Sequence, residues 1–422
     1  VKDEPFGPEY NRGLQYARVS LPGGTVTYTD ADGYYSANIS SSGTATVTLQ
    51  GTYLNPQNAN GGEASVSASV SQNSTQDFHF DNSNSIPGER DTYYHGNLVH
   101  DLLKEIHPAE TGADYSMTAN VNIGSEDWYW PCNAYWDGSS INMFSEGGGC
   151  AATDQMADVV YHEYGHGMQQ FIYDPYSPPT NSGMGEGCSD YWAMTIINSP
   201  CLGNGFFGEG TCLRDGNNDR QYPGNDCGGS VHCLGEITMG SLWLMRGNLI
   251  DYLGYEAAVP HSDTLFVYAQ VARPTTIPDF LDEILIVDDD DGNVNNGTPN
   301  YQAICEGFEA HSVECPFSGP IASLEYDPDS YDISLGVNET TTESLTLFNT
   351  GQSGSVLAYN VGTSPFENIG GGPDGEGNFW TDSDTDPSIP SDWIDISAVG
   401  TQVSFTTNDI AAAPINIGFS FP

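Results

Sequence analysis

The sequence has 422 residues, and its 57 acidic residues against 9 lysines and arginines give a formal net charge of −48. So negative a surface repels nucleic-acid phosphates and anionic lipid headgroups, so we expect no nucleic-acid partner. No stretch reaches the roughly 20 apolar residues of a membrane span, so membrane insertion is not expected. Hydrophobic residues make up 38% of the chain, which is enough to build packed cores in two or three domains.

Residues 1–85 predict an N-terminal β module. Apolar and polar residues alternate in residues 23–39, around a DADG turn, and again in residues 44–54. The polar tract that follows, residues 55–76, is typical of loops or of an edge strand.

From about residue 90 the apolar spacing becomes helical. Four segments have this spacing: residues 92–108, 152–172, 186–198 and 235–254. We therefore expect a second domain over residues 86–318. After Pro316 short alternating segments return, which favours a C-terminal β-sandwich-like region over residues 319–422 that the chain does not complete. The predicted fold class is α+β.

The cysteines favour an oxidising, extracellular location. Eight of the nine fall into close pairs suited to disulfides, which leaves Cys188 single. The predicted pairs are Cys132 with Cys150, Cys201 with Cys212, Cys227 with Cys233, and Cys305 with Cys315. A zinc site made of cysteines is the weaker alternative, because no two Cys-x2-4-Cys units occur.

The acidic composition and the first residue also bear on location. Salt screens the self-repulsion of so acidic a protein, which is typical of a halophilic protein from a saline exterior. An ordinary acidic secreted protein is an equal alternative. The chain starts at Val1 rather than at methionine, so we interpret Val1 as a processed or trimmed start.

The strongest chemical signal is the motif HEYGH, in which His162 and His166 are four residues apart. On a helix both imidazoles share one face and can reach one zinc ion, while Glu163 points toward a metal-bound water. On the next predicted helix, Glu186 can supply a third ligand and leave one position open for water. Asp190, on the same face, can accept a hydrogen bond from His162. In so acidic a chain, two solvated surface carboxylates are the competing interpretation.

HEYGH followed by GMGEGCSDYWA resembles the fungalysin family and its relative, the thermolysin family of gluzincin metallopeptidases. The resemblance implies that His162, His166 and Glu186 bind zinc, that Glu163 is the general base, and that Asp190 orients His162. It also implies a thermolysin/fungalysin-like catalytic domain, and it covers about residues 90 to 315. The cysteine within GMGEGCSDYWA is a departure, since fungalysins usually carry tryptophan there.

Three further stretches are similar to the same families. His232 matches the histidine that stabilises the tetrahedral intermediate, and Asp226 matches its carboxylate partner. Asn133 and the backbone of Ala134 match the strand that holds the substrate main chain, although a hairpin turn would explain them too. Arg214 is a looser match to the arginine that grips the substrate carbonyl, and an isolated loop charge is an equal alternative.

An acidic loop offers a calcium site. Asp289, Asp291, Asn293 and Asn295 alternate oxygen ligands around a glycine turn. The loop lacks the bidentate glutamate of an EF-hand, and a solvated acidic loop is an equal alternative.

Together these features predict a secreted or cell-surface bacterial zinc endopeptidase that acts on polypeptides, binds calcium as well, and attaches to surfaces through its β modules. A silent structural or adhesive protein on a metallopeptidase scaffold is the first alternative. A zinc aminopeptidase is the second, although no motif for a free substrate amine is evident.

Overall fold

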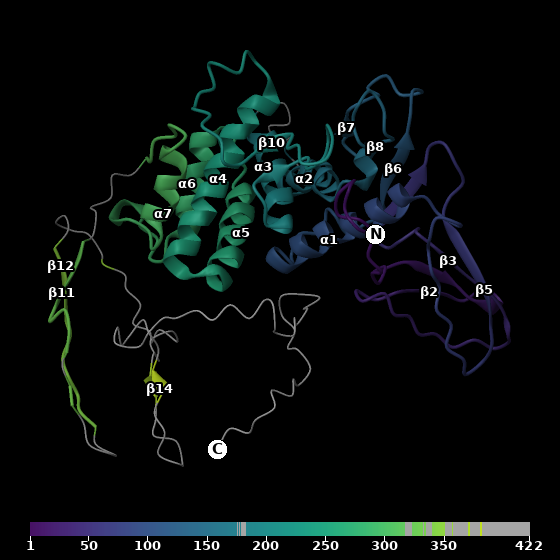
Figure 1. Ribbon diagram of the computed structural model, residues 1–422, viewed down its shortest axis with the longest axis horizontal. Coiled ribbons are helices and arrows are strands. Elements are labelled where there is room, and N and C mark those ends of the chain that lie inside the picture. Colours follow the sequence, from purple (N-terminus) through teal and green to yellow (C-terminus); the bar gives the residue numbers. More distant parts are fainter. Residues whose placement is uncertain are drawn as a thin grey trace, which may run out of the picture. The chain divides into compact units, whose positions relative to one another are not determined.

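The computed structural model describes residues 1–174, 176, 178, 183–316, 323–331, 333–334, 340–350, 357, 370–371 and 380–381. The chain divides into two compact units, Val1–Leu357 and Ala358–Pro422. The first unit contains both helices and sheets, which confirms the predicted mixed fold class (Figure 1). Among the described residues, no helix is long and apolar enough to cross a membrane.

The first sheet is antiparallel and comes from the predicted β module. Its strand order is β2-β1-β3-β5. The strands are β1 (Arg18–Ser20), β2 (Val26–Tyr28), β3 (Gly43–Thr48) and β5 (Ser65–Val70). Alternation places Ala45 and Val47 in the core, while the threonines beside them are less buried. The polar tract supplies β5 at the sheet edge, as predicted.

The second sheet is mixed and has the strand order β4-β6-β8-β7. Its strands are β4 (Leu54–Asn58), β6 (Met117–Ile123), β7 (Ala134–Trp136) and β8 (Ser140–Phe144). β6 pairs in parallel with both β4 and β8, whereas β7 runs antiparallel to β8. A strand from the first 85 residues therefore shares a sheet with strands that follow α1.

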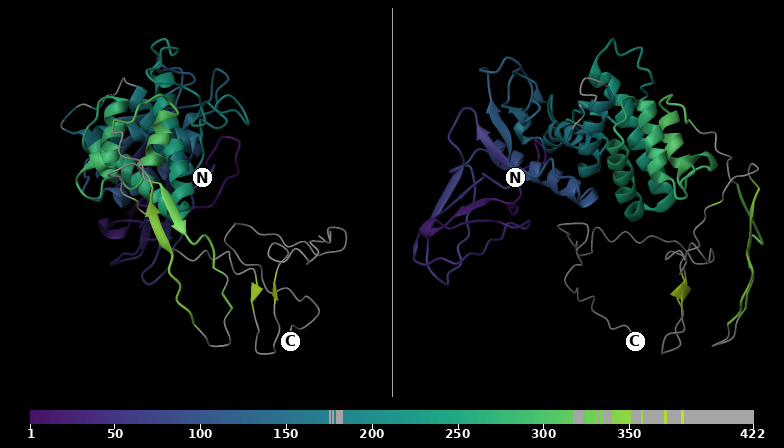
Figure 2. Two further views of the ribbon diagram at one scale, coloured as in Figure 1. Left: turned by 90° about the vertical axis from the view of Figure 1, so that its left-hand side faces the viewer. Right: turned by 180° about the vertical axis from the view of Figure 1, so that it is seen from behind.

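In the described part of the first unit there are seven α-helices. They are α1 (Pro87–Ile106), α2 (Ala157–Tyr173), α3 (Gly183–Ile197), α4 (Val231–Leu253), α5 (Tyr255–Val271), α6 (Ile277–Asp288) and α7 (Tyr301–Glu309). The four predicted helices correspond to α1 through α4. The helices α3 to α7 pack on one another through apolar side chains, and Figure 2 shows them from two further sides.

Glycines let α2, α3 and α4 approach closely. A Cβ on Gly165 of α2 would lie 3.1 Å from the Cα of Ser189 on α3. A Cβ on Gly187 of α3 would lie 2.4 Å from the carbonyl oxygen of Gly235 on α4. These glycines cost helix propensity but allow backbone-to-backbone packing, which brings the site residues of three helices together.

The four predicted disulfides are all present, and Cys188 is free and buried. Toward the C-terminus, β11 (Leu324–Asp327) pairs antiparallel with β12 (Thr346–Asn349). In the second unit, β13 (Gly370–Gly371) pairs with β14 (Trp380–Thr381). The alternating pattern also favours strands at residues 355–362, 393–407 and 416–422, of which the structure describes only Leu357, so the C-terminal sandwich stays a prediction.

Candidate active site

Helix α2 presents the histidine pair. His162, Glu163 and His166 each offer one ligand atom, and these atoms lie within 4.8 Å of one another. The two imidazole rings are edge to face, with centroids 4.8 Å apart. His162 and Glu163 are both buried. The i, i+4 spacing therefore places both imidazoles on one face of α2. Glu163 lies beside them, with a carboxylate oxygen in the same cluster.

Helix α3 adds Glu186 to this space. Its Oε2 lies 3.4 Å from Nε2 of His162 and 3.6 Å from Nε2 of His166. This oxygen is buried and makes no well-aligned hydrogen bond with the described residues. Two ligands about 2.1 Å from a tetrahedral zinc ion lie about 3.4 Å apart. The three side chains are therefore spaced as ligands of one zinc ion, and they fit that metal.

Asp190 contacts the ring nitrogen of His162 that does not face Glu186. It lies one turn after Glu186 on α3, is fully buried, and places Oδ1 2.7 Å from Nδ1 of His162. This contact is a close charge pair rather than a well-aligned hydrogen bond. Arg214 donates to the same carboxylate twice, from Nε at 2.9 Å and from Nη2 at 2.6 Å. This two-pronged pairing fixes a buried carboxylate that would otherwise be costly.

The charges of the site shift the pKa values of its groups. Burial alone lowers the pKa of His162, but the nearby carboxylates, Asp190 foremost, raise it to about 10. Burial alone raises the pKa of Glu186, yet contacts with three histidines hold it well below its usual range. Burial raises the pKa of Glu163. Histidine ligands bind a metal as neutral imidazoles, so a divalent cation would displace the protons that this cluster attracts.

His232 reaches the same carboxylate from the first turn of α4. Its Nδ1 lies 3.0 Å from Oε2 of Glu186, and 57% of its side chain is exposed. Asp226 is not its partner in this structure, because its Oδ2 accepts a 2.8 Å hydrogen bond from Arg220. Arg220 also bonds to Glu236, at 2.9 Å. The structure thus brings His232 to the site and leaves Asp226 in a separate surface ion pair.

The residues expected to hold substrate lie at a sheet edge. Ala134 begins β7, the outer strand of the second sheet, and the carbonyl of Asn133 accepts a hydrogen bond from Thr153 at 3.2 Å. In the same strand, Nε1 of Trp136 donates to Oε1 of Gln170 on α2, at 3.0 Å. β7 therefore lies against the helix that presents the histidines.

The acidic loop after α6 forms hydrogen bonds mainly within itself. Asp289, Asp290 and Asp291 each place a carboxylate oxygen within 4.8 Å of the others. Backbone N–H groups of Gly292 and Asn293 donate to Asp289 at 2.6 Å and Asp291 at 2.9 Å. Asn295 Nδ2 also lies 3.4 Å from Asn293 Oδ1. Oδ1 of Asp289 is buried without a hydrogen-bond partner among the described residues, and calcium binding stays a prediction.

Comparison with known proteins bears on residues 19–170. This range matches the family model of the thermolysin metallopeptidase catalytic domain. It includes HEYGH and ends before Glu186, Asp190 and His232. Among solved structures, the precursor of protealysin, a metalloproteinase from Serratia proteamaculans, is 14% identical with a TM-score of 0.46. The match covers 62% of this chain and 87% of that chain. No curated protein matches the chain.

Proposed function

Because residues 19–170 match the family model of the thermolysin metallopeptidase catalytic domain, we propose that this chain is a zinc-dependent endopeptidase that hydrolyses internal bonds of polypeptides. The observation that carries the proposal is the position of Glu186. Its Oε2 lies at metal-ligand spacing from the Nε2 atoms of His162 and His166, and it has no aligned hydrogen bond of its own among the described residues.

Each residue of the site has a proposed role. His162, His166 and Glu186 would hold zinc, which when bound lowers the pKa of water and polarises the scissile carbonyl. Glu163 takes the proton of the attacking water and passes it to the leaving amine. Burial raises the pKa of Glu163, which makes it a stronger base than an exposed carboxylate. His232, exposed beside the site, would donate a hydrogen bond to the oxygen that becomes negative.

Substrate would align along β7. Among the described strands it pairs with β8 alone, so its other side can pair with an extended peptide. Asn133 and Ala134 stand at the start of this edge. Arg214 uses Nε and Nη2 for Asp190, and its Nη1 makes no hydrogen bond to a described residue. This third nitrogen could bind a substrate carbonyl.

The proposal includes an extracellular location. Four disulfides support export to an oxidising compartment, and the charge of −48 supports a saline one. We also propose that the β modules attach the protein to surfaces. The loop from Asp289 to Asn295 is the proposed calcium site.

Digestion of casein tests the activity. We expect hydrolysis that a zinc chelator abolishes, that added zinc restores, and that the Glu163→Gln variant lacks. A peptide blocked at both ends separates the alternatives, since an endopeptidase cleaves it and an aminopeptidase does not. Wild-type protein that binds zinc but cleaves neither substrate would favour the silent scaffold.

A further inference from the structure

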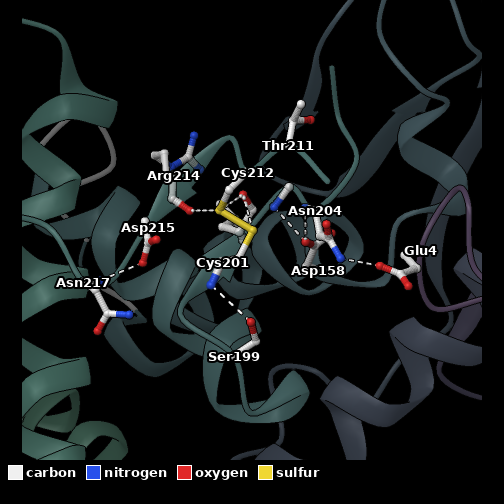
Figure 3. The surroundings of a disulfide bond; sticks show 12 residues. Glu4, Asp158, Ser199, Cys201, Asn204, Thr211, Cys212, Arg214, Asp215 and Asn217 are labelled. Atoms are coloured by element: carbon white, nitrogen blue, oxygen red, sulfur yellow. Dashed lines mark hydrogen bonds between the residues drawn. A yellow bond between two sulfur atoms is a disulfide. The ribbon is translucent and has the colours of Figure 1, made fainter. Parts of the chain in front are cut away.

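A disulfide-closed hairpin follows α3. β9 (Cys201–Leu202) pairs antiparallel with β10 (Arg214–Asp215), so that Arg214 lies opposite Leu202. The Cys201–Cys212 disulfide closes the turn between them (Figure 3). We call residues 201–214 the clamp segment.

The clamp segment is bound to the metal-site helix α2. Oδ2 of Asp158 accepts hydrogen bonds from the backbone N–H of Gly203 at 2.7 Å and of Asn204 at 3.0 Å. Asp158 is buried and lies four residues before His162, on the same helix face. The side chain of Asn204 is held in turn by Glu4 (Figure 3). One part of the segment is thus fixed one turn from a proposed zinc ligand.

The other end of the clamp segment is bound to α3. Arg214, two residues after Cys212, donates twice to Asp190, which lies four residues after Glu186. Asp190 also contacts Nδ1 of His162 at 2.7 Å. The segment therefore connects α2 and α3, and each attachment is one helical turn from a proposed zinc ligand.

The disulfide adds a covalent restraint to a glycine-rich turn in which Leu202 and Phe206 are buried. Residues 202–211 read LGNGFFGEGT, and four glycines leave the backbone many conformations. Cys212 is exposed and Cys201 is only partly buried, whereas each of the other three disulfides contains a buried cysteine. The disulfide therefore links the two ends of the segment covalently, while Leu202 and Phe206 anchor it in the core.

We propose that the clamp segment, closed by Cys201–Cys212, is a positioning element of the metal centre. It holds α2 and α3 at the separation that brings Oε2 of Glu186 to 3.4 Å and 3.6 Å from the Nε2 atoms of His162 and His166. Asp158 and Arg214 are positioning residues in this scheme, because they act through α2 and through Asp190. The inference rests on the zinc site proposed above.

Two matched double variants test the inference. Cys201→Ser with Cys212→Ser opens the clamp, and Cys305→Ser with Cys315→Ser opens a disulfide at α7, away from the ligands. The two pairs are separated by 11 and 10 residues, so loss of either cross-link should lower the Tm by a similar amount. Zinc dissociation constants are measured by competition with a chromophoric chelator, beside Tm, kcat and KM.

Only the clamp variant should weaken zinc binding, by on the order of 10- to 100-fold, with a lower kcat and a smaller change in KM. The α7 variant should stay within about 2-fold of wild type in zinc affinity, because second-sphere effects reach only residues that orient a ligand. Equal zinc affinities in the two variants would overturn the inference.

Asp158→Asn decides the question if the clamp variant does not fold. It keeps the disulfide and weakens the acceptor for Gly203 and Asn204, so zinc affinity should fall several-fold; unchanged affinity would overturn the inference. Failure of the proposed function gives a different result, since wild-type protein would then bind no zinc or cleave no peptide.

Discussion

Gly187 on α3 lies directly against Gly235 on α4, so that a Cβ on Gly187 would be only 2.4 Å from the carbonyl oxygen of Gly235. The same Cβ would lie 2.4 Å from Cβ of Thr238. Because backbone and a buried side chain form this contact, neither can yield easily. Gly187 follows Glu186 directly, so the contact also fixes the backbone position from which the side chain of Glu186 extends.

Gly187→Ala should therefore destabilise the protein and displace Glu186. We expect a loss of about 1–3 kcal/mol in the free energy of unfolding, from overpacking, together with weaker zinc binding. Gly247→Ala, also within a helix, is the control, because a Cβ there meets no atom within 4 Å. It should gain about 0.5–1 kcal/mol through helix propensity. Urea unfolding of both variants checks this, and equal stability would contradict it.

Asp154 should make stability fall as pH rises. Burial, with the charges of Asp91 and Glu89, raises its pKa to about 7, and its Oδ1 has no hydrogen-bond partner among the described residues. The folded protein therefore binds more protons than the unfolded chain between about pH 4 and pH 7, so stability is lost as pH rises through that window.

Asp154→Asn removes this cost, and the amide oxygen of the asparagine can replace Oδ2 of Asp154, which accepts from the backbone N–H of Asn122 at 2.9 Å. The Tm gain over wild type should be several degrees larger at pH 8 than at pH 5. The exposed Asp32→Asn serves as control and should show no such difference. A Tm gain that is the same at both pH values would refute the assignment.

The acidic surface should make the thermal stability of the protein depend on salt concentration. With a net charge of −48, self-repulsion opposes the compact state, and raising salt from about 0.1 to about 1 M shortens the screening length from about 10 to about 3 Å. The Tm should rise with NaCl and equally with KCl, in the presence of a calcium chelator. A flat or falling Tm would argue against adaptation to a saline exterior.

Features set by local spacing, such as helix faces and short disulfide loops, were predictable from the sequence. The packing of one helix against another was less predictable. HEYGH places His162 and His166 together because i, i+4 residues share a helix face. The approach of Glu186 depends on backbone contact between helices, at Gly165 and Gly187. The sequence offered Glu186 as a third ligand but left a solvated surface carboxylate as the alternative, and the family resemblance then favoured the ligand. Spacing within short loops predicted every disulfide, since so few residues leave little choice of partner.

The features that the sequence analysis did not predict have physical reasons. The helices α5 to α7 were not predicted. In α5, apolar residues surround much of the helix and Pro260 interrupts its pattern. Asp158 was overlooked although it lies one turn before His162, since its partners are backbone groups of a distant loop. Asp226 was assigned to His232 by resemblance, and Arg220, six residues earlier, binds it in the structure.

The most direct test of the account is the metal content of the purified protein, measured by mass spectrometry beside peptide hydrolysis on the same samples. Wild type should carry about one zinc per chain and cleave peptide, as expected of a three-ligand catalytic site. Glu186→Ala should lose both, and Glu163→Gln should keep the metal and lose the activity. Wild-type protein without zinc, or a Glu186→Ala variant that keeps both zinc and activity, would contradict the account.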